Sequence, residues 1–343
     1  MKKKLLIRAD GNANIGAGHI MRCLSIANAA KTVGIDVCFI TADESFLQVL
    51  DEQNFRVRAL NSDYKKMDNE LNKIIPIVEM EKPDGIILDS YFVTKSYMNY
   101  LKKTARLIYI DDVMAFPYPV DTLINYNIYA SKKQYTELYD QVNAPNMLLG
   151  SEYVPLRDEF QNGKVIEIKS KVKNILFSAG GADPERIALR FVKSIITKRE
   201  LNDIIFHIVL GSFEPDRNEI ESISTVHSNI ITHNNVRRMS DLMLQCDLAV
   251  SAAGSTLYEL CACGVPTITY VLADNQMPGA KAFSDLGIME NVGDDRFDKD
   301  LINNIISLIE DLDYDKRKLM QHNMKKCIDG KGAYKMIKEL NII

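Results

Sequence analysis

The sequence predicts an α/β protein made of two doubly wound domains that face a cleft. Three observations lead to this prediction. In the first half, short β-branched runs alternate with amphipathic stretches of helical length, which is the pattern of βαβ units around a parallel sheet. The same alternation starts again after residue 173. The 343 residues, 46% of them hydrophobic, fit two ordinary domains and can fill two cores.

The first half is predicted to alternate between strands and helices as far as the fourth strand, after which two further strands follow. The predicted strands are Lys4–Ala9, Asp36–Thr41, Arg56–Leu60, Gly85–Asp89, Arg106–Asp111 and Thr122–Asn125. The predicted helices are His19–Val33, Phe46–Gln53 and Leu71–Glu81. Gly34 ends the first helix and Pro83 follows the last. The run GIILD is almost continuously apolar, as expected of a strand that is buried on both faces.

The second half repeats this architecture without repeating the sequence. The predicted strands are Asn174–Ser178, Ile204–Leu210, Ile230–Thr232, Leu248–Val250 and Thr267–Val271. The helix Thr256–Cys263 is predicted to end at Gly264. Another helix is expected after Asp183, with Asp183 as its N-cap and Pro184 at the first helical position. From Leu301 onward the chain is predicted to be helical and charged.

These elements divide the chain into three parts. Residues 1–155 are predicted to form one Rossmann-like domain, residues 170–330 a second, and residues 331–343 a C-terminal helix that packs back on the first domain. The polar stretch between Arg157 and Lys173 is predicted to hold the linker. Because doubly wound sheets bind ligands at the carboxyl ends of their strands, we expect the ligand in the cleft between the domains.

The overall composition excludes several classes of function. A formal net charge of −4 without a basic face or tail argues against nucleic acid as the partner. No apolar run approaches the roughly 20 residues that span a bilayer, and the basic, then apolar, start is too short for a signal peptide. We therefore expect a cytoplasmic protein without a membrane partner. The oligomeric state stays open, with a monomer favoured.

The cysteines and histidines do not show the spacing of a metal site. None of the six cysteines forms a C-x-x-C pair, and most lie in apolar stretches. The five histidines are scattered along the chain. Reduced core cysteines are therefore a better interpretation than a metal or redox site, and we expect neither a metal nor a cofactor.

The first loop that can carry chemistry connects the first strand to the first helix. Two of its glycines, Gly16 and Gly18, lie within three residues before His19. Glycine allows backbone conformations that a Cβ would forbid and lets a ligand approach closely, and a helix N-terminus attracts anions. The loop has neither the third glycine of a dinucleotide fingerprint nor the Gly-Lys-Ser/Thr of a P-loop.

His19 and Arg22 make this loop more informative. The helix dipole disfavours the protonated ring, and a neutral imidazole can act as a general base. Arg22 lies one turn later on the same helix face and could pair with a diphosphate or with Asp10. A lone histidine is more often a capping or packing residue, but the glycine-rich setting favours His19 as a catalytic residue.

A second loop has the same design in the other half of the chain. Gly254, Ser255 and Thr256 would present N–H groups and hydroxyls at a helix N-terminus, which suits a phosphate. Glu259 lies one turn later, where a carboxylate can accept hydrogen bonds from two ribose hydroxyls. A helix-dipole partner at the surface is the other interpretation of Glu259, and the nearby Asn275-Gln276 makes it the weaker one.

A third small-residue turn, Gly180-Gly181, follows the strand that opens the second half. It is either a plain tight turn or space for a diphosphate, and the local sequence favours neither interpretation.

These motifs resemble those of one known family. The opening R-A-D with I-G-A-G-H-I-M-R, the later A-A-G-S-T-L-Y-E-L and the pair A-D-N-Q are similar to those of the UDP-2,4-diacetamido-2,4,6-trideoxy-β-L-altropyranose hydrolases of pseudaminic acid biosynthesis. They also resemble those of the related spore-coat polysaccharide proteins. Both groups are relatives of the glycosyltransferase B superfamily. The likeness runs over almost the whole chain and includes Leu88–Tyr91, Ile110–Asp112, Leu123–Asn127 and Gly180–Pro184.

The resemblance implies a glycosyltransferase B-like fold and a metal-free hydrolysis of a UDP-sugar. UDP would lie on the second domain, with Gly254–Thr256 at the diphosphate and Glu259 at the ribose. The loop around Val236 would lie near the uracil, and Asn275 and Gln276 near the diphosphate or sugar. His19 would activate a water that attacks the anomeric carbon and releases UDP and the free sugar with inversion.

Three other functions stay open at the level of sequence. The chain could be a UDP-sugar-dependent glycosyltransferase of polysaccharide biosynthesis, or a nucleotide-sugar binding protein without catalysis. It could also be a hydrolase or hydrolysing epimerase for a related nonulosonic acid precursor.

Overall fold

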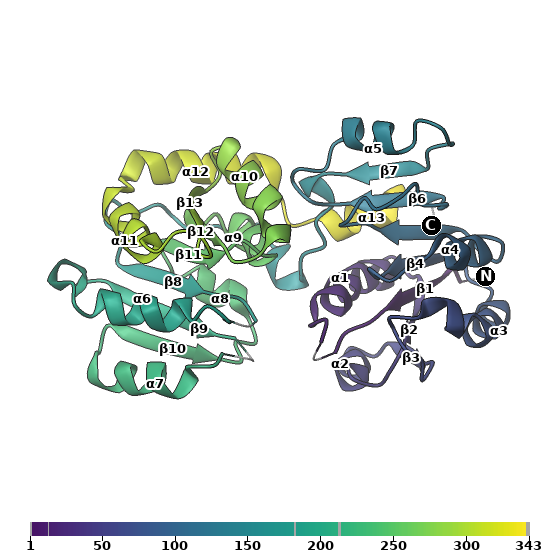
Figure 1. The fold of residues 1–343 in the computed structure, drawn as a ribbon, viewed down its shortest axis with the longest axis horizontal. Coiled ribbons are helices and arrows are strands. Elements are labelled where there is room, and N and C mark those ends of the chain that lie inside the picture. The colour runs from purple at the N-terminus through teal and green to yellow at the C-terminus, as the bar shows by residue number, and fades with distance from the viewer. Residues whose placement is uncertain (1, 13, 182, 212–213, 341–343) are drawn as a thin grey trace. The chain divides into compact units, whose positions relative to one another are not determined.

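The computed structural model describes residues 2–12, 14–181, 183–211 and 214–340. The chain folds into two compact units (Figure 1). Unit 1 comprises the chain up to Asp158 and again from Lys331, and unit 2 comprises Glu159–Gly330. The chain therefore leaves unit 1 once and returns to it at its C-terminal end.

Unit 1 is built on a parallel sheet whose seven described strands have the order β3-β2-β1-β4-β5-β6-β7. The strands are β1 (Lys4–Ala9), β2 (Asp36–Thr41), β3 (Arg56–Ala59), β4 (Gly85–Asp89), β5 (Leu107–Ile110), β6 (Thr122–Asn125) and β7 (Asn146–Leu149). The α-helices are α1 (Gly18–Thr32), α2 (Leu47–Glu52), α3 (Leu71–Glu81), α4 (Lys95–Lys102), α5 (Lys132–Leu138) and α13 (Gly332–Glu339).

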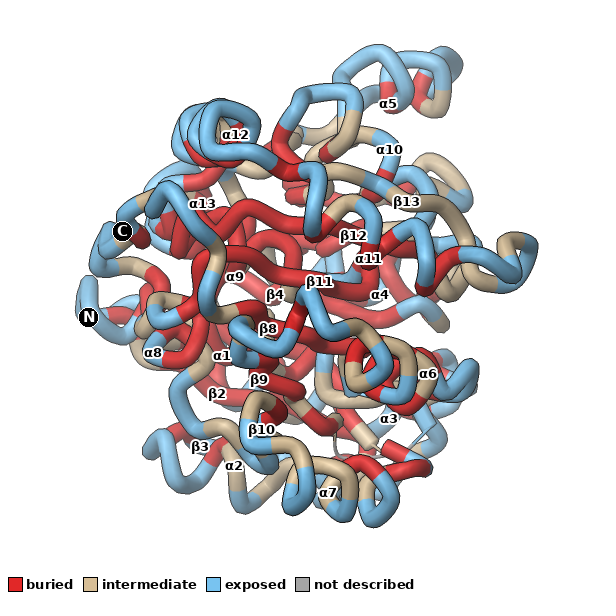
Figure 2. The backbone as a smooth tube through the Cα atoms, turned by 90° about the vertical axis from the view of Figure 1, so that its left-hand side faces the viewer, coloured by how far each residue is buried: buried red, intermediate tan, exposed pale blue. Residues whose placement is uncertain are grey.

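Helices cover both faces of this sheet. On one face, Ile74 of α3 and Tyr97 of α4 join Leu6 and Ile86 of the strands in one buried apolar cluster. Successive strand residues point to opposite faces, so the buried Leu5 lies on the other face, where α1 packs on β1 and β2. Figure 2 shows the resulting pattern, with buried strands in red and exposed outer helix turns in pale blue.

The C-terminal helix α13 belongs to unit 1, where it packs against α1 and the short 3-10 helix η2 (Ser151–Tyr153). A Cβ at Gly332 would lie 2.2 Å from the carbonyl oxygen of Val154, so only glycine permits this close approach. Near the other end of the helix, Arg106 Nη1 donates a hydrogen bond to the carbonyl oxygen of Leu340 at 2.5 Å. Both contacts fix the returning segment.

Unit 2 repeats the architecture with six described parallel strands in the order β10-β9-β8-β11-β12-β13. The strands are β8 (Asn174–Ser178), β9 (Ile205–Leu210), β10 (Ile230–Asn234), β11 (Leu248–Ala252), β12 (Thr267–Val271) and β13 (Glu290–Asp294). The α-helices are α6 (Ile187–Ile195), α7 (Arg217–Val226), α8 (Met239–Met243), α9 (Thr256–Cys263), α10 (Met277–Asp285), α11 (Leu301–Asp311) and α12 (Tyr314–Cys327).

The core of unit 2 lies between its sheet and the helices α6 and α11. Phe177 of β8 stacks on Phe191 of α6 with ring centroids 4.6 Å apart, and Ile305 of α11 belongs to the same cluster. The sheet therefore rests on a rigid aromatic and aliphatic layer, which fixes the strand ends that carry the loops.

The predicted α/β class with two doubly wound parallel sheets is confirmed, and many element bounds agree with the prediction. The strands β1, β2, β4, β6, β8 and β12 and the helices α3 and α9 have the predicted bounds. The helix α9 ends as expected at Gly264, which adopts a left-handed conformation with φ of 65°. The prediction did not include α4, α5, α7, α8, α10, β7 or β13.

The predicted start of α6 is wrong by three residues. The helix begins at Ile187, not at Pro184. Asp183 nevertheless serves the helix start, because its carboxylate accepts hydrogen bonds from the backbone N–H groups of Ile187 at 3.0 Å and Ala188 at 2.7 Å. The segment between Asp183 and the helix is a turn, and Arg186 in a left-handed conformation precedes the first helical residue.

The strand order places a switch point in each sheet. In unit 1 the order reverses between β1 and β4, and in unit 2 between β8 and β11. Ligands of doubly wound sheets bind beyond the carboxyl ends of the strands at such points. The residues at or after the ends of these four strands include His19, Asp89, Gly180-Gly181 and Gly254–Thr256. Topology and sequence therefore point to the same loops.

A buried ion pair lies in the interior of unit 1, near the end of β1. Arg8 is fully buried and donates two hydrogen bonds to Glu70, at 2.7 and 2.9 Å. The second carboxylate of the cluster, that of Asp10, lies 2.6 Å from Arg8. Tyr97 and Ser62 donate further hydrogen bonds to Glu70, each at 2.7 Å. The opening R-A-D is thus largely structural.

A pair of histidines joins β9 and β10 in unit 2. His207 Nδ1 lies 3.0 Å from His233 Nε2, and His207 Nε2 lies 3.2 Å from Asn174 Oδ1. Burial lowers the pKa of both histidines, and for His207 the neighbouring His233 lowers it further. A neutral pair that shares one hydrogen bond is therefore the folded form.

The described residues contain no helix with both the length and the apolar content that a bilayer span requires. Five of the six cysteines are buried and Cys327 is half-buried, so most of them lie in the cores, as the sequence predicted.

Replacing Arg8 with Met should destabilise the fold strongly. The change would leave the carboxylates of Glu70 and Asp10 buried without a cation, which costs on the order of 3–5 kcal/mol of unfolding free energy. Arg56→Met is a matched control, because Arg56 is 45% exposed and its ion pairs should contribute only about 0–1 kcal/mol. Urea unfolding measures both. Equal losses in the two variants would contradict this account.

The histidine pair should make stability depend on pH. Since the folded pKa values lie below the usual 6.5, the unfolded chain binds protons more readily, and stability should fall as the pH drops below 6.5. The double variant His207→Gln/His233→Gln should show a smaller loss between about pH 7.5 and 5.5 in urea midpoints. His322→Gln, at an exposed position, should behave like the wild type. If the urea midpoint of the double variant depended on pH as steeply as that of the wild type, the histidine pair would not be the cause of the pH dependence.

Candidate functional site

The loop between β1 and α1 brings its glycines to open space beside His19. Gly16 has a φ of 74°, and its N–H donates to the carbonyl oxygen of Asn12 at 2.8 Å, so a tight left-handed turn requires glycine there. Gly18 begins α1, and a Cβ at either glycine would meet no atom within 4 Å. The loop therefore leaves room in front of the helix N-terminus.

His19 is buried and is bonded to a buried carboxylate. Its Nδ1 lies 2.6 Å from Oδ1 of Asp89, the last residue of β4. Burial opposes ionisation of Asp89 most strongly, but Arg22 and His19 outweigh it and hold its pKa well below the usual range. A carboxylate oxygen can only accept, so the short contact requires a proton on Nδ1. In a neutral ring, the second nitrogen, Nε2, is then a proton acceptor.

Nothing in the described part of the chain occupies that acceptor. Nε2 of His19 has no hydrogen-bond partner among those residues. The ring packs edge-on against Tyr91, with centroids 4.5 Å apart, and Tyr91 is itself half-exposed. The imidazole is thus held on two sides, by Asp89 and by Tyr91, while its basic nitrogen remains available. Such a group can take a proton from a bound water or hydroxyl.

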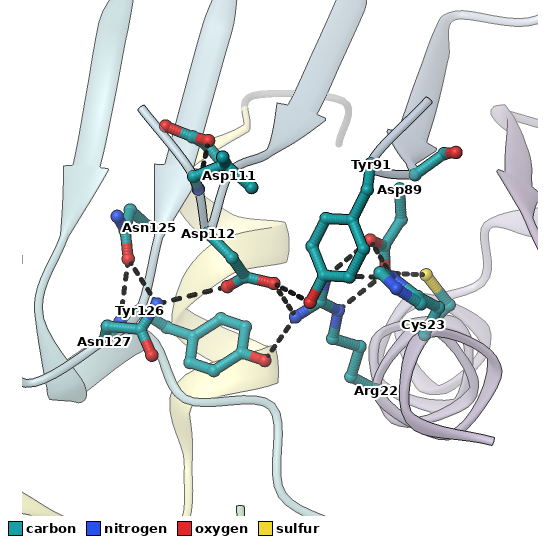
Figure 3. Close-up of polar contacts among 12 residues, drawn as sticks. Arg22, Cys23, Asp89, Tyr91, Asp111, Asp112, Asn125, Tyr126 and Asn127 are labelled. Atoms are coloured by element: carbon teal, nitrogen blue, oxygen red, sulfur yellow. Dashed lines mark hydrogen bonds and ion pairs between the residues drawn. The ribbon is translucent and has the colours of Figure 1, made fainter. Parts of the chain in front are cut away.

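Arg22 reaches from α1 across the ends of the neighbouring strands (Figure 3). Its Nε and Nη2 donate to the two oxygens of Asp89, at 2.6 and 2.5 Å. Its Nη1 donates to Asp112 Oδ2 at 2.6 Å and to the hydroxyl of Tyr126 at 2.7 Å. The expected alternative of a pair with Asp10 is wrong, because Asp10 lies against Arg8 instead. One guanidinium thus joins residues at the ends of β4, β5 and β6.

The two consecutive aspartates after β5 have different surroundings. Asp111 is fully buried and accepts hydrogen bonds from Val113 N at 2.9 Å, Met114 N at 3.0 Å, and the hydroxyls of Tyr118 at 3.0 Å and Tyr135 at 2.5 Å. It fixes the turn after the strand.

Asp112 points to the opposite side, toward Arg22 (Figure 3). Its Oδ1 accepts a hydrogen bond from Asn127 Nδ2 at 3.1 Å, and its Oδ2 accepts one from the Tyr91 hydroxyl at 3.2 Å. Its side chain keeps 17% of its surface exposed. Asp111 is therefore structural, and Asp112 belongs to the group of polar residues around His19.

In unit 2, the turn after β11 carries unpaired donors at a helix start. Gly254 and Ser255 are exposed, and Thr256 is half-buried as the first residue of α9. No side chain caps this helix, and the N–H groups of Ser255 and Thr256 have no acceptor within the described ranges. Glu259 lies half-buried in the first turn of the helix. Free N–H groups at a helix N-terminus suit an anion.

The other predicted binding residues of unit 2 follow neighbouring strands. Gly180 and Gly181 come after β8, and a Cβ at Gly211, after β9, would lie 2.3 Å from the Gly180 carbonyl oxygen. The turns after β8 and β9 therefore pack backbone against backbone, which requires a glycine that the sequence analysis did not single out. A Cβ at Gly180 or Gly181 would meet no atom within 4 Å. The structure is therefore compatible with both interpretations of this pair, a tight turn and space for a diphosphate.

Val236 and the Asn275-Gln276 pair also lie beyond the carboxyl ends of strands. Val236 is half-buried after β10, next to Asn235, whose φ of 49° marks a sharp turn. Asn275 is exposed after β12. The side-chain oxygen of Gln276 accepts a hydrogen bond from Leu272 N at 2.8 Å, which folds the loop and leaves its amide nitrogen to donate elsewhere.

The structure groups the predicted residues by unit. Gly16, Gly18, His19 and Arg22 lie together in unit 1, and the remaining predicted residues share the carboxyl edge of the sheet of unit 2. Sequence reasoning gave no roles to five residues around His19, which are Asp89, Tyr91, Asp112, Tyr126 and Asn127. Their common signal was available: each is a polar residue at or just after the end of a buried parallel strand.

Comparison with known proteins relates this fold to that of glycosyltransferases. Residues 175–340 match the family model of the glycosyltransferase family 28 C-terminal domain. Among solved structures, MurG of Acinetobacter baumannii aligns with a TM-score of 0.71 at 12% identity, covering 99% of this chain and 100% of that one. The fold is therefore that of the glycosyltransferase B class, as the sequence predicted.

Curated relatives match over most of the chain at low identity. An uncharacterized protein of Methanocaldococcus jannaschii is 27% identical over 80% of this chain, which spans only 56% of that longer protein. The spore coat polysaccharide biosynthesis protein SpsG of Bacillus subtilis is 23% identical, with 96% of this chain and 95% of that protein covered. The UDP-2,4-diacetamido-2,4,6-trideoxy-β-L-altropyranose hydrolase of Campylobacter jejuni is 25% identical, with 75% and 87% covered.

Replacing Asp111 with Asn should cost more stability than the same change at Asp112. The introduced amide would present a donor where the buried carboxylate of Asp111 accepts four hydrogen bonds, and an unpaired buried polar group costs about 1–3 kcal/mol. Asp112 is partly exposed, so water can replace the partners that its carboxylate loses. Chemical unfolding of both variants checks this. A larger loss for Asp112→Asn would reject the division of roles.

Proposed function

We propose that the chain hydrolyses a UDP-linked sugar to UDP and the free sugar, with His19 as the general base. The observation that carries the proposal is the His19–Asp89 pair, which fixes the proton on Nδ1 and leaves Nε2 as the acceptor. Nε2 would take a proton from water while the water oxygen bonds to the anomeric carbon. The bond between that carbon and the diphosphate oxygen breaks, UDP leaves, and the configuration is inverted.

UDP is proposed to bind to unit 2. The free N–H groups of Ser255 and Thr256 would receive the diphosphate and stabilise the charge of the leaving group, so that little protonation of UDP is needed. Glu259 would accept hydrogen bonds from the ribose hydroxyls, and Val236 would lie at the uracil. Gly180 and Gly181 would make room for the phosphates.

The sugar is proposed to lie at the open space beside His19. The open space at Gly16 and Gly18 would admit it beside His19, and Asn275 with the amide nitrogen of Gln276 would bind it or the neighbouring phosphate. The proposal uses these side chains and backbone groups alone. It assigns no metal and no cofactor.

The names of the relatives support a particular substrate. The hydrolase of Campylobacter jejuni and a bifunctional protein of Helicobacter pylori, 24% identical over 84% of this chain, are both named for UDP-2,4-diacetamido-2,4,6-trideoxy-β-L-altropyranose. We propose this UDP-sugar as the substrate, in pseudaminic acid biosynthesis. The relation to a spore coat polysaccharide protein is compatible with a closely related diamino sugar.

A UDP-sugar-dependent glycosyltransferase is the second candidate. It is favoured by the match to the glycosyltransferase family 28 domain and by the shared fold. In that case His19 would take the proton from an acceptor hydroxyl instead of from water. Incubation with the UDP-sugar and water alone separates the two functions, because only a hydrolase releases the free sugar rapidly.

Replacing His19 with Asn should abolish hydrolysis and spare UDP binding. Asn can keep a donor toward Asp89 but offers no basic nitrogen, and loss of a general base typically costs about 10²–10⁴-fold in rate. The rate is followed by NMR of the released sugar, and the affinity for UDP by calorimetry. His322→Asn, at an exposed position of unit 2, is the matched control.

Two results would contradict the proposal. One is a wild-type protein that releases no sugar from a panel of UDP-linked diamino sugars yet transfers one to an added acceptor. The other is a His19→Asn variant with undiminished turnover.

A further inference from the structure

We infer that Arg22 is a positioning residue, which orients Asp89 and Asp112 around His19 and does not bind the diphosphate. The inference rests on the proposed function and replaces the expectation that Arg22 contacts the substrate phosphates. It follows from how the hydrogen-bond donors of the guanidinium are used.

The guanidinium has five N–H groups, and the structure accounts for four of them. Nε and one N–H of Nη2 form a fork on the two oxygens of Asp89. The two N–H groups of Nη1 go to Asp112 Oδ2 and to the hydroxyl of Tyr126. The remaining N–H of Nη2 lies on the side of His19 Nδ1, 3.0 Å away. A nitrogen that already carries a proton cannot accept it, so this is a contact and not a hydrogen bond.

The burial of Arg22 and the charges around it also argue against diphosphate binding. The Arg22 side chain is 11% exposed and faces two carboxylates, those of Asp89 and Asp112. Two negative charges share one cation, so a diphosphate that took over the guanidinium would leave both carboxylates without this cation and beside an added anion. Breaking a buried pair in this way is strongly unfavourable. A phosphate would therefore find only one unused N–H on Arg22, which faces the His19 ring, and two carboxylates that repel it.

The same geometry gives Arg22 a task in the reaction. The fork fixes the plane of the Asp89 carboxylate, and Oδ1 of that carboxylate is the atom that accepts the Nδ1 proton of His19. The hydrogen bond from Arg22 Nη1 fixes the carboxylate of Asp112, which also accepts hydrogen bonds from Asn127 and Tyr91. Without the fork, Asp89 could rotate, and the His19 ring would lose its orientation. The effect should be seen in the chemical step and not in the binding of UDP.

The variants Arg22→Lys and Arg22→Met test the inference. A lysine keeps the charge but cannot form the fork, and a methionine removes both. We expect kcat for the UDP-sugar to fall about 10²-fold in Arg22→Met and less in Arg22→Lys, because displacement of a catalytic group by about 1 Å can cost that much. The dissociation constant of UDP, measured by calorimetry, should change less than about threefold. Arg56→Lys, at an exposed ion pair of unit 1, is the matched control.

The opposite pattern would overturn the inference. A diphosphate ligand would show as a UDP affinity at least about tenfold weaker in both variants, with kcat at saturating substrate kept. If Arg22→Met does not fold, Arg22→Lys with and without Asp112→Asn decides, because residues that act together give effects on kcat that do not add. Additive effects would reject the coupling to Asp112.

The inference and the proposed function fail in different ways. A wild-type protein that hydrolyses no UDP-sugar refutes the proposed function. The UDP affinity of Arg22→Lys, together with the downfield NMR signal of the His19 Nδ1 proton, still decides the role of Arg22. The inference then requires unchanged affinity and a lost or shifted signal, and weakened affinity with an unchanged signal would reject it.

Discussion

The buried carboxylate of Asp89 is the constraint on which the rest of the site depends. A charge at the end of a buried strand is unfavourable unless cations and donors surround it. Here Arg22 supplies a bidentate fork and His19 supplies the Nδ1 proton, while Cys23 donates from its thiol at 3.3 Å. All three partners stabilise the same carboxylate. The position of the imidazole, its tautomer and the direction of the guanidinium are therefore fixed together.

The fold explains why these groups meet. The strands β1 and β4 are neighbours in the sheet but far apart in sequence, since the chain winds to one side through β2 and β3 before it crosses back. The helix that follows β1 therefore starts beside the end of β4, and the next strand ends add Asp112 and Asn127. Unit 2 has the same winding, and its switch point holds turns of small residues in place of titratable groups.

Much of the fold and part of the site could be predicted from sequence. Continuous apolar runs such as Gly85–Asp89 and glycine-closed helices such as Thr256–Cys263 carry strong local signals, and their bounds agree with the structure. The strand β13 and the helix α7 are rich in polar residues, and few of their residues are buried. The role of Asp89 could not be predicted, because it depends on the contact with His19, 70 residues earlier. The same holds for Arg22, whose partners come from three strand ends.

The tautomer of His19 decides most directly whether this residue can be the base. A neutral ring with its proton on Nδ1 is required if Asp89 orients a base, and a proton on Nε2 would leave that nitrogen unable to accept another. Nitrogen NMR of the histidine-labelled wild-type protein near neutral pH distinguishes the two forms. We expect a proton on Nδ1, bonded to the Asp89 carboxylate, and an unprotonated Nε2. A His19 ring with the proton on Nε2 would contradict the assignment.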